Sequence, residues 1–320
     1  MFKFIPRVKI KKIITAAILI VGFSFFLYQF SPPKIGARKE IFVIPLRISQ
    51  DEIIEKLQSE GFIKNKTSFN WVLTLKRSQG KIASGGYFIS KNMWDWEIAE
   101  ILISHPSQNW VVLQEGLRRE EIAEILKNKL NWSEDKKEKF LTETKEGYLF
   151  PDTYLIDLDW PGEKVAKRLN SQFEEKVANL FKEAEENNIR NDTLITLASL
   201  VQREAANEKE MPLIAGILWN RLLKGIPLQI DATIQYVLGK PGNWWPIIKS
   251  EDYKIDSPYN TYLYKGRPPM PICNPGLAAI EAVIHPEETE YLYYLHDSEG
   301  QIHLAKTYEE HKANIAKYLR

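Results

Sequence analysis

Residues 192–224 read DTLITLASLVQREAANEKEMPLIAGILWNRLLK, and this stretch predicts two helices joined by a short loop. Asp192 is expected to cap the N-terminus of the first helix, which runs to about residue 206. Pro212 suits the first turn of the second helix, and Gly225 follows that helix directly. The stretch therefore predicts a helical hairpin that holds Glu204 rigidly.

Glu204 has an unusual position for a charged residue, because it shares a helix face with apolar side chains. The apolar residues at positions i, i+3 and i+4 of this face are Leu197, Leu200 and Val201. Glu204 follows at i+7. Apolar surroundings raise the pKa of a carboxyl group, and a general acid for glycosidic cleavage must be protonated near neutral pH. The alternative is a structural glutamate paired with Arg203 or Arg221.

The composition limits the function classes. A length of 320 residues leaves room for one large domain or two ordinary ones. A net charge of +1 argues against a broad nucleic-acid-binding surface. Nine Trp and fourteen Tyr suit stacking on sugars, although most aromatic side chains serve packing. Cys273 is the only cysteine, which excludes an intramolecular disulfide and a thiolate metal cluster.

The N-terminus predicts a membrane anchor. Its basic residues are Lys3, Arg7, Lys9, Lys11 and Lys12. Residues 13–30 carry no charge, a length that just spans a bilayer. The positive-inside rule then places the N-terminus in the cytoplasm and the rest of the chain outside. A cleaved signal peptide is the alternative, but no A-x-A-like site precedes Ser31.

The segment after the anchor predicts a compact α+β module. Its expected elements are a strand at 41–46, a helix at 50–60 capped by Ser49, a helix continuation or turn at 71–76, a strand at 85–89 and a helix at 94–104. Two short strands with helices between them suit a small domain. This domain is either purely structural or a carbohydrate-binding module.

The remaining segments predict a larger mixed domain. A strand is expected from Val111, and the helix at 118–129 follows Glu115, which is either an acid of the site or a turn and capping residue. Residues 146–154 are expected to form an aromatic turn, and 162–188 a charged helix. Residues 226–276 are rich in Pro, Asn, Gly and aromatics, which is typical of ordered binding loops. Asp231 has the alternative role of capping a helix at 232–238.

Other reaction classes lack their motifs. The five histidines form no i,i+4 pair and no H-E-x-x-H, and the sequence contains no Walker, dinucleotide or G-x-S-x-G motif. We therefore expect no metal and no cofactor. The reaction class that remains is carboxylate chemistry in an aromatic, polar groove.

Seven ordered motifs carry a resemblance to a known family. They are LASLVQRE at 197–204, NRL at 220–222, LQIDATIQY at 228–236, YNTY at 259–262, PP at 268–269, NPG at 274–276 and HP at 285–286. With EGYLFPDTY at 146–154, the chain resembles the endolytic murein transglycosylases (the MltG or YceG-like family) over nearly all of its length beyond the anchor. The resemblance implies an α+β fold with a LysM-like glycan-binding subdomain, a catalytic domain and a single catalytic glutamate, Glu204.

The expected organisation follows from the anchor and the resemblance together. It comprises a cytoplasmic tail at 1–12, a transmembrane helix at 13–30, a linker at 31–39, a LysM-like subdomain at 40–106 and a catalytic domain at 107–320. The sequence departs from the family pattern in places. Gln202 stands where the family often has a second glutamate, and Met270 replaces a usual glycine. The stretch from Trp244 to Pro246 also has its own sequence, so the subsites are expected to differ more than the chemistry.

The implied reaction is lytic cleavage of the β-1,4 bond between N-acetylmuramic acid and N-acetylglucosamine, which leaves a 1,6-anhydromuramyl end. Glu204 is expected to act first as acid and then as base. The candidate glycan contacts are Gln229, Asp231, Tyr259, Asn260 and Tyr262. The expected location is the bacterial cytoplasmic membrane, with glycan strands and peptidoglycan synthases as partners and no nucleic acid. The alternative is a membrane-anchored glycan-binding scaffold without activity.

Overall fold

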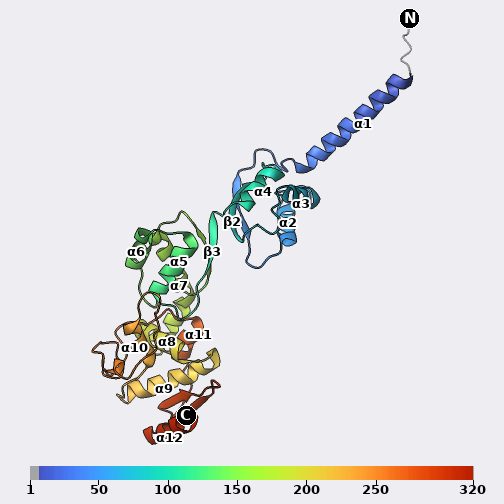
Figure 1. The fold of residues 1–320 in the computed structure, drawn as a ribbon. Helices are drawn as coiled ribbons and strands as arrows, with labels where there is room; N and C mark the ends of the chain where they lie inside the picture. Colours follow the sequence, from blue (N-terminus) through green and yellow to red (C-terminus); the bar gives the residue numbers. More distant parts are fainter. Residues whose placement is uncertain (1–6, 320) are drawn as a thin grey trace. The chain divides into compact units, whose positions relative to one another are not determined.

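The structure, a computed structural model, describes residues 7–319 and divides them into two compact units (Figure 1). Unit 1 comprises the chain up to Trp110 together with residues 155–159. Unit 2 comprises residues 111–154 and the chain from Trp160 onward. Helices and strands occur in both units, which confirms the mixed α+β class.

Unit 1 begins with the apolar helix. α1 spans Arg7–Phe30, and its segment Lys11–Phe30 is long and apolar enough to cross a membrane. The unit continues with β1 (Lys39–Ile44), α2 (Gln50–Ser59), α3 (Lys66–Leu75), β2 (Gly85–Ser90) and α4 (Asp95–Ile103). β1 pairs antiparallel with β2, and α2 and α3 lie between these strands in the sequence.

The local sequence accounts for these elements. Ser49 accepts a hydrogen bond from the backbone N–H of Glu52 and completes a capping box, as expected for the start of α2. The strand predicted at 41–46 lies two residues earlier, because Pro45 has no N–H for a further ladder bond. The segment expected at 71–76 as a helix continuation or a turn is helical to Leu75 and forms the second half of α3, which Asn65 caps. The side chains that α2 buries are Ile53, Ile54 and Leu57.

A four-stranded sheet has the order β1-β2-β3-β4. β3 spans Gln108–Val112, three residues earlier than predicted, and Gly86 pairs with Gln108. β4 spans Thr153–Asp157 at the end of the segment expected to be an aromatic turn. The chain passes between the two units in these strands.

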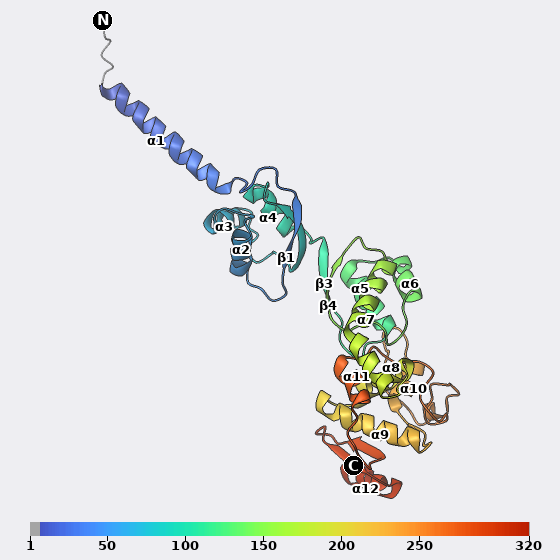
Figure 2. The same ribbon diagram turned by 180° about the vertical axis from the view of Figure 1, so that it is seen from behind.

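Unit 2 is mainly helical. Its elements are α5 (Arg119–Leu130), α6 (Glu134–Thr142), α7 (Gly162–Glu186), α8 (Asn191–Glu204), α9 (Met211–Leu223), α10 (Asp231–Leu238), α11 (Leu277–Ile284), β5 (Tyr293–His296), β6 (Ile302–Ala305) and α12 (Tyr308–Tyr318). α8 packs against α9 and α11 around the apolar core. Figures 1 and 2 show α9 between these helices and the C-terminal hairpin with α12. The helical hairpin predicted from residues 192–224 is confirmed as α8 and α9.

The predicted N-cap of α8 is wrong. The helix starts at Asn191, and Arg190 occupies the cap position. The carboxylate of Asp192 instead forms ion pairs with Arg190 at 2.9 Å and Arg267 at 2.8 Å. Asp192 therefore ties α8 to the proline-rich loop at 267–271.

Gly216 allows a close backbone contact on α9. A Cβ atom at this position would lie 2.2 Å from the carbonyl oxygen of Glu287. The backbone N–H of Glu287 donates to Pro212 O at 2.9 Å, so the segment after α11 lies directly on α9. The segment held by this contact connects α11 to β5.

Candidate active site

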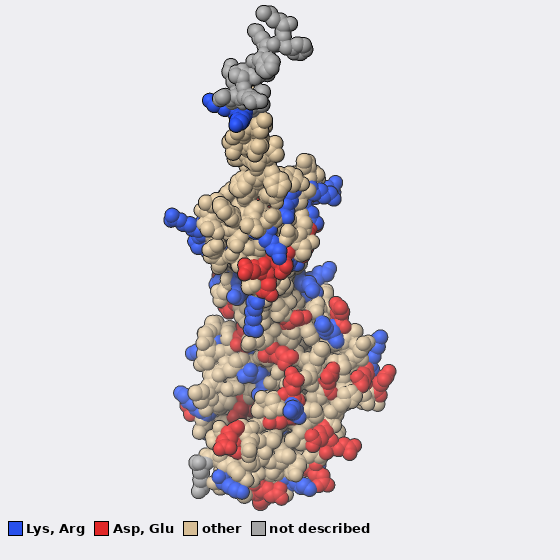
Figure 3. Space-filling view, turned by 90° about the vertical axis from the view of Figure 1, so that its right-hand side faces the viewer, with Lys and Arg blue, Asp and Glu red and all other residues tan. Residues whose placement is uncertain are grey.

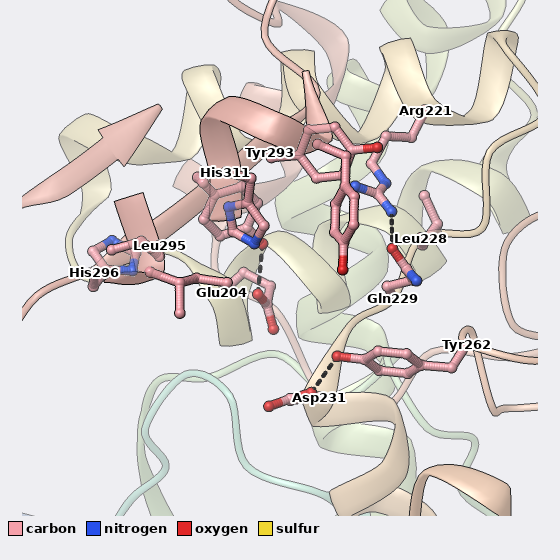
Figure 4. A pocket seen from close by; sticks show the side chains of 13 residues that line it. Glu204, Arg221, Leu228, Gln229, Asp231, Tyr262, Tyr293, Leu295, His296 and His311 are labelled. Atoms are coloured by element: carbon pink, nitrogen blue, oxygen red, sulfur yellow. Dashed lines mark hydrogen bonds between the residues drawn. The ribbon is translucent and has the colours of Figure 1, made fainter. Parts of the chain in front are cut away.

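A cavity of about 430 Å³ in unit 2 contains Glu204 (Figure 4). The residues around Glu204 come from α9, the loop before α10, the first residue of α10, the loop at 262, the β5 strand and α12. They are Arg221, Leu228, Gln229, Asp231, Tyr262, Tyr293, Tyr294, Leu295, His296, Tyr308, His311 and Ile315. Segments far apart in the sequence, from Glu204 to Ile315, therefore form one site.

Glu204 is the last residue of α8 and is partly buried in this cavity. Its Oε2 accepts a hydrogen bond of 2.5 Å from the Tyr294 hydroxyl, which β5 supplies. The expected alternative, an ion pair with an arginine, is not what the structure shows. Arg203 lies over the Trp245 ring at 3.8 Å from its centroid, and Arg221 bonds to other groups. Glu204 therefore has a phenol as its partner.

The surroundings raise the pKa of Glu204. Removal of the carboxylate from water is the largest cause, and the nearby negative charge of Asp231 acts in the same direction. The Tyr294 hydrogen bond and the positive charges of His296 and Arg203 oppose the rise in pKa. The C-terminal position on α8 also favours the protonated form, because this end of a helix carries partial negative charge. The arrangement suits a proton donor.

Asp231 supplies a second carboxylate to the same cavity. Tyr262 donates to Asp231 Oδ1 at 2.5 Å, and the Tyr253 hydroxyl donates to the same carboxylate at 3.2 Å. The predicted capping role of Asp231 is wrong, because the residue is the first of α10 and Ile230 holds the cap position. Two phenols rather than a helix end therefore fix this carboxylate.

Gln229 and Arg221 form one wall of the site. Gln229 has a left-handed backbone (φ 55°), which is uncommon for a residue with a side chain. Its Oε1 accepts a 2.6 Å hydrogen bond from Arg221 Nη2. The buried Arg221 guanidinium also donates to the carbonyl oxygens of Pro227 and Leu292. Arg221 thus joins the loop before α10 to the start of β5.

The last two candidate contacts do not line the cavity. Asn260 is fully buried, and its Nδ2 donates to the carbonyl oxygens of Tyr253 and Ile255. Its Oδ1 accepts from the backbone N–H of Tyr262 at 3.0 Å, so it orients the chain at this tyrosine. The Tyr259 ring packs against that of Tyr236 at 5.0 Å between centroids. Gln229, Asp231 and Tyr262, by contrast, surround the cavity with Glu204.

The sequence reasoning missed the residues of the C-terminal hairpin. Tyr294 of β5 donates to Glu204, and His296 of the same strand lies on the Glu204 side of the cavity in Figure 4 and forms a 2.9 Å pair with Glu210. The aromatic-rich run YLYYLH at 291–296 is typical of a strand, but nothing in it points to the site. Among residues 7–319, no three His, Cys, Asp or Glu side chains gather closely enough to hold a metal ion.

Comparison with known proteins identifies the family. The model of the YceG-like family matches residues 42–317. The chain belongs to the YceG-like family. Its resemblance to this family, inferred from seven motifs, is therefore confirmed.

Named relatives agree with this membership. An endolytic murein transglycosylase of Bacillus subtilis is 31% identical over 334 residues, covering 94% of this chain and 91% of that protein. A protein of the same name from Streptococcus pneumoniae is 34% identical over 177 residues, 54% of this chain but only 32% of that longer protein. The crystal structure of a yceG-like protein from Listeria monocytogenes has 26% identity and a TM-score of 0.58, covering 87% of this chain and 99% of that one.

Gln202, at the position where the family often has glutamate, has a structural partner. Its Oε1 accepts a 2.9 Å hydrogen bond from the backbone N–H of Gly276, in the NPG motif. It also bonds to Glu115, whose pKa is raised first by burial and then by the negative charge of Glu208. Glu115 does not cap α5, since Arg118 holds that position. Gln202 therefore joins the end of α8 to the start of α11 outside the Glu204 cavity.

Proposed function

We propose that this protein is an endolytic lytic transglycosylase of murein, which cleaves the β-1,4 bond between N-acetylmuramic acid and N-acetylglucosamine and so ends strand elongation. One observation carries the proposal: Glu204, a carboxyl group with a raised pKa, lies in a cavity beside a phenol donor and a second carboxylate. Relatives named endolytic murein transglycosylase support the same activity.

Glu204 acts first as a general acid. Its protonated carboxyl donates to the glycosidic oxygen, the bond from this oxygen to muramic acid C1 breaks, and N-acetylglucosamine leaves with a free 4-hydroxyl. Positive charge then develops on the muramyl ring. The Tyr294 hydroxyl stabilises the carboxylate that remains, because it already donates to Oε2.

Glu204 then acts as a base. The muramic acid C6 hydroxyl attacks C1 of its own ring, and the ionised Glu204 accepts the hydroxyl proton. The product is a 1,6-anhydromuramyl end, no water is consumed, and Glu204 is protonated again for the next cycle. One group that serves as acid and base needs a pKa near the working pH, and burial raises the pKa of Glu204 in that direction.

Asp231 has an electrostatic role in this mechanism. Its negative charge raises the pKa of Glu204 and lies in the same cavity as the positive charge that develops on the sugar. Two tyrosine hydroxyls occupy its oxygens, which restrains it from activating water. Gln229 and Tyr262 are the neighbouring glycan contacts, whereas Asn260 and Tyr259 shape the loop that carries Tyr262.

The remaining assignments complete the proposal. The transmembrane segment at 13–30 anchors the chain in the bacterial cytoplasmic membrane, with the tail at 1–12 in the cytoplasm. Residues 31–39 form the linker between the membrane segment and the next subdomain. Residues 40–106 form a LysM-like glycan-binding subdomain, which the β-α-α-β order of β1, α2, α3 and β2 supports. Residues 107–320 form the catalytic domain, and peptidoglycan synthases supply the nascent strands.

The products decide between this reaction and its alternatives. The purified full chain in detergent is incubated with uncrosslinked glycan strands, and the new ends are analysed by mass spectrometry. We expect muramyl ends that lack one water relative to reducing ends. Reducing ends would instead indicate a hydrolase with Asp231 as its base, and binding without new ends would indicate a scaffold.

A matched pair of variants tests the site. Glu204→Gln is expected to abolish new ends while glycan binding persists. Glu208→Gln, which removes an exposed carboxylate four residues later, should leave the rate unchanged. Normal cleavage by Glu204→Gln would overturn the assignment of the catalytic residue.

A further inference from the structure

The last turn of α1 is packed into unit 1. Phe30 is only 6% exposed, belongs to the apolar core of the unit and stacks on Trp96 with 6.1 Å between ring centroids. The Lys64 ammonium lies 3.5 Å from the Tyr28 ring centroid and donates to Ser31 Oγ at 2.7 Å. The folded part of unit 1 therefore starts where the apolar helix ends.

Polar contacts hold the start of α3 against the same turn. Ser68 Oγ donates to the Gln29 carbonyl oxygen at 3.3 Å, and Asn65 Nδ2 donates to Gln29 Oε1 at 3.4 Å. A small cavity of about 160 Å³ lies at this junction. Its lining residues are Phe26, Gln29 and Phe30 from α1 and Asn65, Thr67, Ser68 and Trp71 from unit 1. Trp71 thus lies at the level of the last apolar turn.

Large apolar side chains are exposed around this junction. Trp71 and Leu75 lie four residues apart on one face of α3 and are 59% and 65% exposed. Trp96, which stacks on Phe30, is 41% exposed. A soluble surface rarely gathers such side chains, and here they continue the apolar surface of α1.

We propose that Trp71, Leu75 and Trp96 form a membrane-interface surface that rests in the headgroup region of the bilayer around the end of α1. This inference rests on the proposed anchor. Phe26 and Phe30 belong to the last turn of the proposed transmembrane segment and lie about 6 Å apart along the helix axis. The hydrocarbon core of the bilayer ends at this turn, so a side chain at the same level lies at its edge. Tryptophan prefers this depth, because its ring is apolar and its N–H needs a polar partner.

The charge of unit 1 fits the same partner. Residues 31–110 contain eleven Lys and Arg against eight Asp and Glu. Blue side chains occur on unit 1 close to the tan apolar helix in Figure 3. Two of the eleven Lys and Arg residues of this segment are Lys64, beside Tyr28, and Lys66, at the start of α3. The surface therefore suits a bilayer that contains anionic lipid.

Tryptophan fluorescence tests this surface, because all nine Trp lie beyond α1. The full chain is reconstituted into vesicles of phosphatidylglycerol and phosphatidylcholine, with or without bromine on the upper acyl chain. We expect brominated lipid to quench part of the emission, and Trp71→Phe to remove about half of the quenched part if two indoles share this depth. Trp160→Phe, in unit 2, should leave the quenched part unchanged.

Each result has one meaning. Flotation of the vesicles in a density gradient first shows whether the chain is bound to them. If the chain does not float with the vesicles, the anchor fails and this proposal fails with it, while cleavage in the detergent assay still stands. If the chain floats without quenching, the interface surface alone is wrong. The same holds if Trp71-dependent emission responds to N-acetylglucosamine oligomers but not to brominated lipid, since Trp71 would then bind sugar.

Discussion

The Tyr294 hydroxyl donates a hydrogen bond of 2.5 Å to Glu204 Oε2, across ninety residues of sequence. A phenol can donate this bond to the carboxylate, and its own pKa is raised because it is buried next to Glu204. Tyr294 therefore stays a neutral donor while Glu204 gives up and regains its proton. The following predictions for the site depend on this pairing.

Removal of the Tyr294 hydroxyl should slow the reaction and shift its pH dependence. The hydrogen bond favours ionised Glu204, so its loss in Tyr294→Phe raises the pKa further. We expect the alkaline limb of the pH–rate profile to move to higher pH, with a maximal rate lowered about tenfold. Tyr264→Phe is the control, because that hydroxyl bonds Asp256 outside the cavity. If the alkaline limb does not move, the assignment of Glu204 as the general acid is wrong.

Neutralisation of Asp231 should move the same limb in the opposite direction. The negative charge of Asp231 raises the pKa of Glu204, so Asp231→Asn lowers it, and the alkaline limb moves to lower pH. Asp256→Asn removes a carboxylate that also accepts from a tyrosine, but outside the cavity, and should have no effect. Profiles measured with the same glycan substrate give the comparison. If Asp231→Asn and Tyr294→Phe move the alkaline limb in the same direction, the electrostatic account is wrong.

Glu146 should make unit 2 less stable as the pH rises. Burial raises its pKa from 4.5 to about 8, with the negative charge of Glu120 as the next cause. Between these values the folded state keeps a proton that the unfolded state releases, so stability falls by about 1.4 kcal/mol per pH unit. Glu146→Gln keeps an acceptor for Asn274 and removes this dependence. Urea unfolding at pH 5.5 and 8 measures this dependence, and the stability of the variant relative to the natural chain should be greater at pH 8 than at pH 5.5.

Gly216→Ala should destabilise the protein, although alanine favours helices. Propensity alone predicts a gain of about 1 kcal/mol in a helix interior. The added methyl group would instead meet the Glu287 backbone, a contact that costs about 1–3 kcal/mol to relieve. Thermal unfolding followed by circular dichroism decides the sign. A higher melting temperature would show that the segment at 287 moves freely away from α9.

Local patterns predicted the elements whose causes are local. The Ser49 capping box fixed the start of α2, and apolar spacing fixed α8 and α9 with Glu204 on the correct face. Asp192 was assigned as a cap on the same logic and proved wrong, as did the alternative capping role of Asp231. Each carboxylate bonds side chains from a distant loop, Arg267 in one case and Tyr262 in the other. A sequence pattern does not contain such long-range partners.

The site was predictable only in part for the same reason. Gln229, Asp231 and Tyr262, predicted as glycan contacts, line the cavity with Glu204, and the segment that carries them has a distinctive composition. Tyr294 and His296 come from a hairpin with little local signal, and only the fold brings them to Glu204. Asn260 was predicted to contact glycan, but its side-chain amide forms its hydrogen bonds within the loop.

The burial of Phe30 has a mechanical consequence. A side chain of the apolar helix is part of the core of unit 1, and the following residues bond to the same unit. The helix and the unit therefore share their rotational freedom instead of being joined by a swivel. If α1 spans a bilayer as proposed, unit 1 must turn when α1 tilts or turns, and a pulling force on either is transmitted to the other through the Phe30–Trp96 stack.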